Sequence, residues 1–175
     1  QSDDLPFKQR WSKDRVPYIA LSNCCPPNVV RTIAEVSDYA YSVSDKGLWF
    51  NLYGGNSLTT KLTDGSHISL TEETNYPWDG KIKISISETG SKAYSLFLRI
   101  PSWTHGAQIS INGKVANVKA TPGTYAEVNR VWKKGDIVEL NLPMEATLIE
   151  ANPLVEENRN QIAVKRGPVV YCLES

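Results

Sequence analysis

The apolar residues of this chain change their spacing at Gly47, and this change constrains the fold more than any other feature. Between positions 28 and 43 they recur at steps of three and four, as on one helix face; they are Val29, Val30, Ile33, Val36, Ala40 and Tyr41. After Gly47 apolar and polar residues alternate, most regularly in "KIKISIS" at 81–87, as on a strand with one buried face. The sequence therefore predicts one amphipathic helix followed by a β-rich region.

Local signals mark both ends of the predicted helix. Pro26 and Pro27 precede it, and proline suits a first turn because the N–H that it lacks would be unpaired there. At the other end, Gly47 is able to adopt the left-handed conformation that ends many helices. We therefore expect a connecting arm over residues 1–25 and a helix over residues 28–43.

The rest of the chain contains short alternating segments separated by turn signals. The expected strands are 48–53, 57–62, 66–71, 81–87, 93–100, 107–111, 137–142, 146–149, 161–165 and 168–173. Gly-Gly, Asp-Gly, Asn-Gly and Pro-Gly pairs lie between them. Strands of this length and spacing are typical of an antiparallel β-sandwich or jelly roll. We expect a mainly β protein, with residues 1–46 forming one part and residues 47–175 a β-sandwich domain.

The charge pattern argues against charged macromolecular partners. Nineteen basic residues balance nineteen acidic residues, without a run of like charge, so neither a nucleic acid nor an anionic membrane is an expected partner. No apolar run approaches the roughly 20 residues that cross a bilayer, and the first residues lack a signal-peptide pattern. An exported and a cytoplasmic location both stay open.

Two of the three cysteines, Cys24 and Cys25, are adjacent, immediately before the two prolines. A disulfide between neighbours would strain the backbone. The start of a helix favours negative charge and therefore the thiolate, which attacks electrophiles and binds zinc. A structural zinc site needs about four ligands, and neither a CxxC partner nor paired histidines lie nearby, since His67 and His105 are isolated. A functional dithiol and two small buried apolar cysteines both remain open.

Other residue types give weaker signals. Cys172 lies in the apolar run 169–173 and is expected in the core. Paired carboxylates would suit a glycosidase, but the acidic residues are interpreted as solubilising; they are Glu72, Glu73, Asp79, Glu127, Glu156 and Glu157. Tryptophan rings could stack on sugars, although core or interface packing is the favoured interpretation for each; these are Trp49, Trp78, Trp103 and Trp132.

The order of the motifs carries more information than any one of them. They are "CCPPN" at 24–28 with Arg31, "GLWFNLY" at 47–53, "TNYPWDG" at 74–80, "LRIPSW" at 98–103, "NG" at 112–113, "WKKGD" at 132–136 and "RGPVVY" at 166–171. From about residue 20 to the end, this series closely resembles the C-terminal part of the β-L-arabinofuranosidase family, glycoside hydrolase family 127.

The resemblance implies a division of labour within a larger enzyme. Proteins of that family carry an (α/α)6 barrel with the active site, followed by β-sandwich domains. Residues 1–46 would then be the end of the barrel, with its last helix, and residues 47–175 the accessory sandwich. By position, Cys24 would be the nucleophile and a zinc ligand, and Cys25 a second zinc ligand. The remaining ligands, a glutamate and a third cysteine, would come from barrel sequence that this chain does not contain.

Three functional hypotheses follow. In the first, the chain is a fragment of a retaining glycosidase that acts on glycans containing L-arabinofuranosides, and it neither hydrolyses glycosides nor holds zinc tightly without the barrel. In the second, the sandwich is a carbohydrate-binding module. In the third, it supports the barrel structurally, which is the role favoured for residues 47–175.

Overall fold

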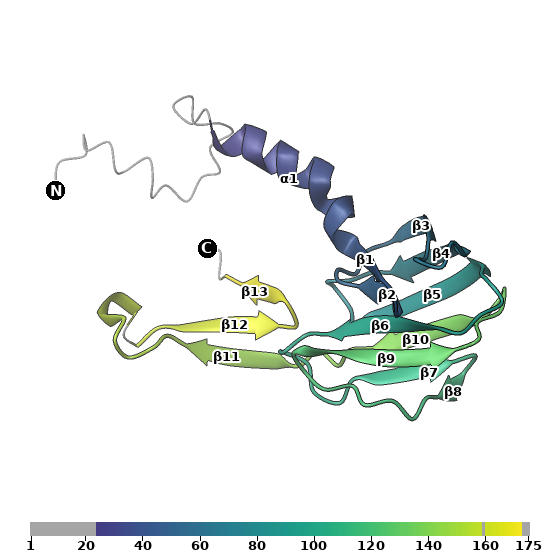
Figure 1. Cartoon of the computed structure of the whole chain (residues 1–175). Helices are drawn as coiled ribbons and strands as arrows, with labels where there is room; N and C mark the ends of the chain where they lie inside the picture. The colour runs from purple at the N-terminus through teal and green to yellow at the C-terminus, as the bar shows by residue number, and fades with distance from the viewer. Residues whose placement is uncertain (1–23, 159, 173–175) are drawn as a thin grey trace. The chain divides into compact units, whose positions relative to one another are not determined.

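The computed structural model describes residues 24–158 and 160–172, which contain one α-helix, one short 3₁₀ helix and thirteen strands (Figure 1). These residues belong to two units, one that includes residues 24–36 and one that comprises Ser37–Cys172. The elements are α1 (Cys25–Ala40), β1 (Tyr41–Ser44), β2 (Gly47–Phe50), β3 (Asn56–Lys61), β4 (His67–Thr74), β5 (Lys81–Glu88), β6 (Tyr94–Ile100), β7 (Gln108–Ile111), β8 (Lys114–Val115), β9 (Thr124–Arg130), β10 (Ile137–Asn141), β11 (Ala146–Glu150), the 3₁₀ helix (Glu156–Asn158), β12 (Ile162–Arg166) and β13 (Val169–Tyr171). The connecting arm expected over 1–25 lies almost entirely outside the described residues.

The predicted helix exists, but both of its ends are displaced toward the N-terminus. It begins at Cys25, before the prolines, and ends at Ala40, where residues 41–44 leave the helix as strand β1. Cross-strand pairing explains the early end, because β1 pairs antiparallel with β2 and Tyr41 lies opposite Phe50. Gly47 therefore does not end the helix as predicted, but lies in a hairpin opposite Ser44, where its φ of 143° suits glycine.

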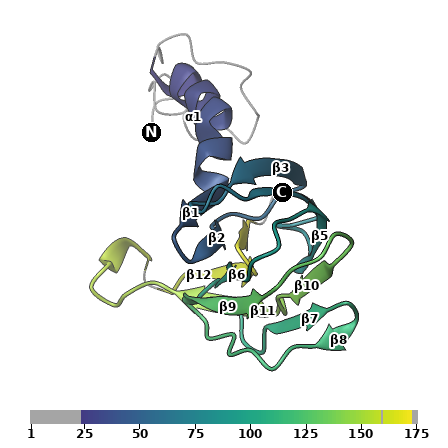
Figure 2. The ribbon, with the colours of Figure 1, turned by 45° about the vertical axis from the view of Figure 1, so that its right-hand side comes forward.

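The mainly antiparallel β-sandwich that the sequence predicts is confirmed. A four-stranded sheet in the order β1-β2-β6-β9 packs against a six-stranded sheet in the order β3-β4-β5-β10-β7-β8 (Figures 1 and 2). Within these two sheets only the β2–β6 pair is parallel in the described residues. β5 follows the predicted alternation, with Ile82, Ile84 and Ile86 buried between its solvent-facing polar residues. The core lies between the two sheets.

Strand β9 was not predicted from the sequence, yet it completes the four-stranded sheet. It pairs with β6 along seven residues. Its inward side chains are small and few, since only Ala126 and Val128 are buried, and polar residues surround them. Such a strand has little intrinsic signal, and its pairing with the strongly apolar β6 stabilises it. The short strands β1 and β8 were missed as well.

A third sheet, in the order β11-β12-β13, follows the sandwich along the chain. Its side chains are largely exposed; in β11 all five residues are exposed, and Leu148 is 68% accessible. Cys172 directly follows β13 and is also exposed, so the prediction that it lies in the core is wrong. An apolar run becomes buried only when a second layer covers it, and no described residue covers Cys172. The division into residues 1–46 and 47–175 stays a prediction.

Candidate functional site

The two adjacent cysteines lie at the start of α1 with their sulfur atoms close together. Cys24 immediately precedes the helix and Cys25 is its first residue, and both are exposed. Their Sγ atoms are 3.7 Å apart, well beyond the roughly 2.05 Å of a disulfide bond. Two thiolates on one tetrahedral zinc ion, each about 2.3 Å from the metal, are separated by about 3.8 Å. The spacing of the two thiols therefore fits two positions of a single zinc site.

The first helical turn offers fewer amide donors than the sequence argument expects. Pro26 and Pro27 occupy its second and third positions and have no N–H. The next amide, that of Asn28, donates to the carbonyl oxygen of Cys24 over 3.2 Å. Of the free N–H groups that usually make a helix start attractive to an anion, the two that Pro26 and Pro27 would otherwise provide are absent. Any activation of Cys24 therefore has to come mainly from other groups.

The described residues supply only part of a metal site. Within residues 24–158 and 160–172, no group of three or more His, Cys, Asp and Glu residues could hold a metal ion. His67 at the start of β4 and His105 in a turn are exposed, as expected for isolated surface histidines. The two thiols provide two sulfur donors, a type of donor that suits zinc.

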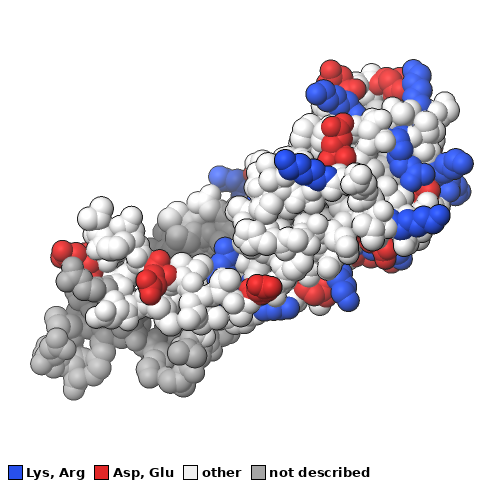
Figure 3. Space-filling model, turned by 90° about the horizontal axis from the view of Figure 1, so that it is seen from below, with Lys and Arg blue, Asp and Glu red and all other residues white. Residues whose placement is uncertain are grey.

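A shallow groove of about 510 Å³ lies on the solvent face of the six-stranded sheet. Seven of the nine lining residues are polar or charged, although apolar atoms make up most of the exposed lining surface. The lining comes from β4, β5, β7 and β10; it consists of Glu73, Lys81, Ile82, Lys83, Gln108, Ser110, Glu139, Leu140 and Asn141. The Nζ atom of Lys83 lies 2.7 Å from Oε2 of Glu73, and this contact raises the pKa of the lysine. Basic and acidic side chains are interspersed on the face shown in Figure 3. The groove is therefore suited to neutral polar ligands more than to a polyanion.

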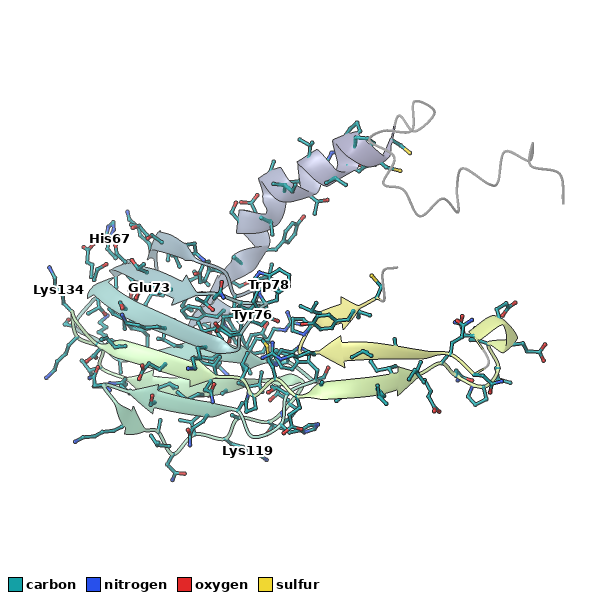
Figure 4. The ribbon with its side chains drawn as sticks, turned by 180° about the vertical axis from the view of Figure 1, so that it is seen from behind. His67, Glu73, Tyr76, Trp78, Lys119 and Lys134 are labelled. Carbon is teal, nitrogen blue, oxygen red and sulfur yellow. The ribbon has the colours of Figure 1, made fainter. Side chains whose placement is uncertain are left out.

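The tryptophans differ widely in exposure. Trp132 is buried at 1% exposure, and its Nε1–H donates to the carbonyl oxygen of Tyr94 over 3.0 Å. Trp49 stacks on Phe97 with a centroid distance of 3.8 Å. Trp78 is 61% exposed, and it lies with Tyr76 at the end of the sandwich opposite His67 and Lys134 (Figure 4). Trp103 is half-buried against the core. Packing, as favoured from the sequence, therefore accounts for three of these four rings.

Among the carboxylates, Glu72 departs from the interpretation given by the sequence. It is 1% exposed on β4, so calling it a solubilising residue is wrong. Burial raises its pKa to about 7, against hydrogen bonds from the Gly54 N–H and the Tyr41 hydroxyl that act in the opposite direction. A signal was present, because Glu72 is in phase with Ile68 and Leu70 on the buried face of β4. The position of an acidic residue in the two-residue alternation therefore predicts its burial better than its residue type does.

Two family models match the chain. The sequence model of the β-L-arabinofuranosidase GH127 middle domain matches residues 47–144. That match covers more than half of the chain. The chain belongs to glycoside hydrolase family 127. The model of the family's C-terminal domain matches residues 146–175, so the sandwich and the third sheet correspond to two separately defined family domains.

Characterised and solved members of family 127 resemble the chain along nearly its whole length. A non-reducing end β-L-arabinofuranosidase of Bifidobacterium longum subsp. longum is 33% identical over 98% of the chain. A solved glycoside hydrolase is 49% identical over 99% of the chain, with a TM-score of 0.86. A GH127 β-L-arabinofuranosidase from Geobacillus stearothermophilus T6 is 37% identical over 97%, with a TM-score of 0.83. The chain spans only 26%, 29% and 27% of these relatives, respectively.

The described part of the chain contains no helix of the length and apolarity needed to cross a membrane.

Proposed function

We propose that this chain supplies the nucleophile segment and the accessory β-domains of a retaining β-L-arabinofuranosidase. Membership of family 127 supports the reaction class. The single observation that carries the proposal is the pair of exposed thiols at the start of α1, 3.7 Å apart. An accessory domain alone would not need two accessible cysteines in this position.

In the proposed reaction, Cys24 is the nucleophile. Its thiolate attacks the anomeric carbon of the arabinofuranoside, a C–S bond forms, and the bond to the leaving oxygen breaks as a general acid protonates that oxygen. Water then attacks the same carbon, gives up a proton to a base, and Cys24 leaves as a thiolate. Two displacements at one carbon retain the configuration. The acid and base are outside the described residues.

Cys24 and Cys25 would together hold a zinc ion. Their spacing fits two positions of a tetrahedral site, and the remaining ligands would come from an upstream helical barrel. A bound zinc ion would keep both thiols deprotonated at neutral pH. Cys25 would hold the metal without attacking the sugar, and the Sγ atom of Cys24 would face the substrate.

The exposed apolar stripe of α1 supports an association with such a barrel. None of the helix residues is buried, and Val29, Val30 and Ile33 are more than half exposed. An amphipathic helix gains most of its stability from packing its apolar face. The sandwich would then buttress the barrel, which is the structural role that the sequence favoured for residues 47–175.

The proposal is tested by comparing the 175-residue chain with a longer protein that includes the upstream barrel. The longer protein is expected to release L-arabinose from β-linked L-arabinofuranosides and to contain about one zinc ion per molecule by elemental analysis. The isolated chain is expected to do neither, because in this proposal the barrel supplies the general acid and half of the ligands. Robust release of L-arabinose by the isolated chain would contradict this division of roles.

A second function, glycan binding by the sandwich, is favoured by the polar groove on the six-stranded sheet. Carboxylate, amide and ammonium groups from four strands line about 510 Å³, and sugar hydroxyls hydrogen-bond to such groups. The groove residues contain no aromatic ring on which a sugar could stack, which limits the expected affinity to the millimolar range, roughly 4 kcal/mol.

Calorimetric titration of the chain with arabinan or arabinogalactan oligosaccharides tests this second function. If the groove binds them, Lys83→Ala and Glu139→Ala should each weaken binding by roughly tenfold, about 1.4 kcal/mol, because each removes a polar group of the lining. Lys119→Ala, which changes a residue outside the groove lining, is the control and should bind like the parent chain. A flat titration with every oligosaccharide removes this function.

A further inference from the structure

A closed ring of hydrogen bonds surrounds the buried side chain of Glu72. The Gly54 N–H donates to Oε1 of Glu72 over 2.7 Å, and the Tyr41 hydroxyl oxygen lies 3.2 Å from Oε2. Tyr41 also contacts Oδ1 of Asn56 at 2.7 Å, and Nδ2 of Asn56 donates back to the carbonyl oxygen of Gly54 over 2.6 Å. Four residues, from β1, β3, β4 and the segment between β2 and β3, thus complete one circuit.

The orientation of the Asn56 amide is fixed by this circuit. Its nitrogen faces the Gly54 carbonyl oxygen at 2.6 Å. The opposite orientation would place two acceptor oxygens at that distance, which is unfavourable. The oxygen of Asn56 therefore faces Tyr41, and the hydroxyl of Tyr41 has to donate to it.

If Glu72 is ionised, the contact between Tyr41 and Glu72 has no proton to form a hydrogen bond. Tyr41 has a single hydroxyl proton, and the shorter contact, 2.7 Å to Asn56, uses it. The 3.2 Å contact would then bring a lone pair of the Tyr41 hydroxyl oxygen against Oε2 of an ionised Glu72, unless Glu72 itself carries a proton. If Tyr41 turned its proton to Glu72 instead, Oδ1 of Asn56 would face a lone pair at 2.7 Å. Only a protonated Glu72 satisfies every member of the ring.

We propose that Glu72 is buried as a neutral carboxylic acid that donates to Tyr41, and that its ionisation is a pH-sensitive switch for the segment between β2 and β3. In the neutral ring, Glu72 donates to Tyr41, Tyr41 to Asn56, Asn56 to Gly54, and Gly54 to Glu72. Loss of one proton leaves one of these contacts without a donor, next to a carboxyl group whose residue is only 1% exposed.

Among the residues that the structure describes, no cation pairs with Glu72. Tyr41 from β1 contacts it directly, and Tyr53 in the β2–β3 segment is close enough for their charges to repel. The charge of Arg99 in β6 lowers the pKa of Tyr53, whereas Tyr76 between β4 and β5 and Tyr125 in β9 raise it. No described residue forms an ion pair with Glu72. Burial accordingly raises the pKa of Glu72 from 4.5 to about 7, and burial with the charge of Glu72 raises that of Tyr41.

The segment held by the ring also anchors the end of α1. The N–H groups of Asn51 and Leu52 donate to the carbonyl oxygen of Ala40 over 2.9 and 3.3 Å. Oδ1 of the Asn51 side chain accepts from the Tyr125 hydroxyl over 2.8 Å, and the backbone carbonyl oxygen of Asn51 accepts from Nη1 of Arg99 over 2.9 Å. The segment 51–55 is thus tied to the ring through Gly54 at one end, and at the other end Asn51 and Leu52 donate hydrogen bonds to Ala40, the last residue of α1. Ionisation of Glu72 is expected to loosen this support.

Glu72→Gln tests the proposal, because glutamine mimics the neutral acid: its amide donates to Tyr41 and its oxygen accepts from Gly54. Between pH 4.5 and 7 the unfolded parent chain releases the Glu72 proton while the folded chain retains it, so stability is lost as pH rises through this window. The unfolding equilibrium constant of the parent chain should rise by on the order of 100-fold from this group. In Glu72→Gln this rise should be absent, so the variant should exceed the parent in stability at pH 8.

Glu73→Gln is the matched control. Glu73 is the next residue along the strand, its side chain is exposed, and it pairs with Lys83 at the surface. This variant should keep the pH dependence of the parent chain, measured by urea unfolding at a series of pH values. If Glu72→Gln and Glu73→Gln show the same pH dependence, the switch is wrong.

A direct titration keeps the proposal testable even if Glu72→Gln does not fold. The side-chain carboxyl carbon of Glu72 in the parent chain, followed by NMR, should titrate with a midpoint near 7. A midpoint at or below 4.5, the ordinary value, would overturn the proposal. Hydrogen exchange at pH 8 adds a local readout: the amides of Asn51 and Leu52 should exchange about tenfold more slowly in Glu72→Gln than in the parent chain.

Discussion

Replacing Cys24 with serine in a longer protein that includes the barrel is expected to lower turnover of β-L-arabinofuranosides by roughly 10³-fold or more. A hydroxyl at this position ionises far less readily than a thiol and is a poorer zinc ligand, so the variant loses the attacking group. The measurement is the rate of L-arabinose release under saturating substrate. Because the thiol is exposed and packs against no core residue, the substitution should leave folding intact.

Two further cysteine variants test the role of Cys25 and the specificity of the effect. Cys25→Ser should lower zinc content as well as activity, because Cys25 is expected to bind zinc but not to attack the sugar. Cys172→Ser is the matched control: this third cysteine is exposed and follows β13, so its replacement should change neither quantity. If Cys24→Ser retains the turnover of the parent enzyme, the assignment of the nucleophile is wrong.

Replacing Trp132 with alanine is expected to destabilise the sandwich by about 3–5 kcal/mol. The ring is 1% exposed, packs near Tyr94 with a centroid distance of 6.3 Å, and donates a hydrogen bond to the Tyr94 carbonyl oxygen. Truncation would leave a large cavity and a carbonyl group without its donor. Urea unfolding of the chain, followed by circular dichroism to avoid the loss of tryptophan fluorescence, measures the effect.

Trp78→Ala is the control for this loss. Its ring is 61% exposed, so we expect a change of less than about 1 kcal/mol. Should Trp132→Ala fail to fold, Trp132→Phe, which retains most of the apolar volume but loses the hydrogen bond, should lose about 1–3 kcal/mol. Equal effects at Trp132 and Trp78 would show that burial in the sandwich core does not govern its stability.

The two family domains within the chain differ in how they are stabilised. The sandwich has a continuous core that includes Phe50, Leu96 and Leu140, each at most 1% exposed. The three-stranded sheet that follows has no comparable core in the described residues, and Ile162 and Val170 are more than half exposed. A small sheet with an apolar surface gains stability mainly by packing against another layer. The matched boundary between residues 144 and 146 coincides with this change.

Much of the fold was predictable because local periodicity and burial coincide along most of the chain. β5 and β10 alternate regularly, pair with each other, and bury the residues that their pattern indicates. The ends of α1 were not predictable to the residue, because the competing strand pairing of residues 41–44 with β2 is a tertiary effect. β9 was missed for the same reason, since its pairing with β6 supplies the stability that its own residues do not.

The features of the candidate site also fall into those that residue order predicts and those that it does not. That two cysteines adjoin each other before two prolines at a helix start, and that ordered motifs match family 127, could be read from residue order alone. Residue order did not reveal how close the sulfur atoms lie, because side-chain direction depends on where the helix begins. Residue order does place Glu72 in phase with the buried Ile68 and Leu70. It did not reveal that Cys172 is exposed, since burial depends on which layers cover a strand.

The class of fold, the position of the helix and the family follow from residue order alone, because they depend on spacing within short segments. The partner of each strand, the layer that covers each apolar face and the hydrogen-bond ring around Glu72 are visible only in the folded chain. Burial and hydrogen-bond satisfaction depend on groups that are distant in the chain: Tyr41 and Glu72, 31 positions apart, belong to different sheets and contact each other where the two sheets pack.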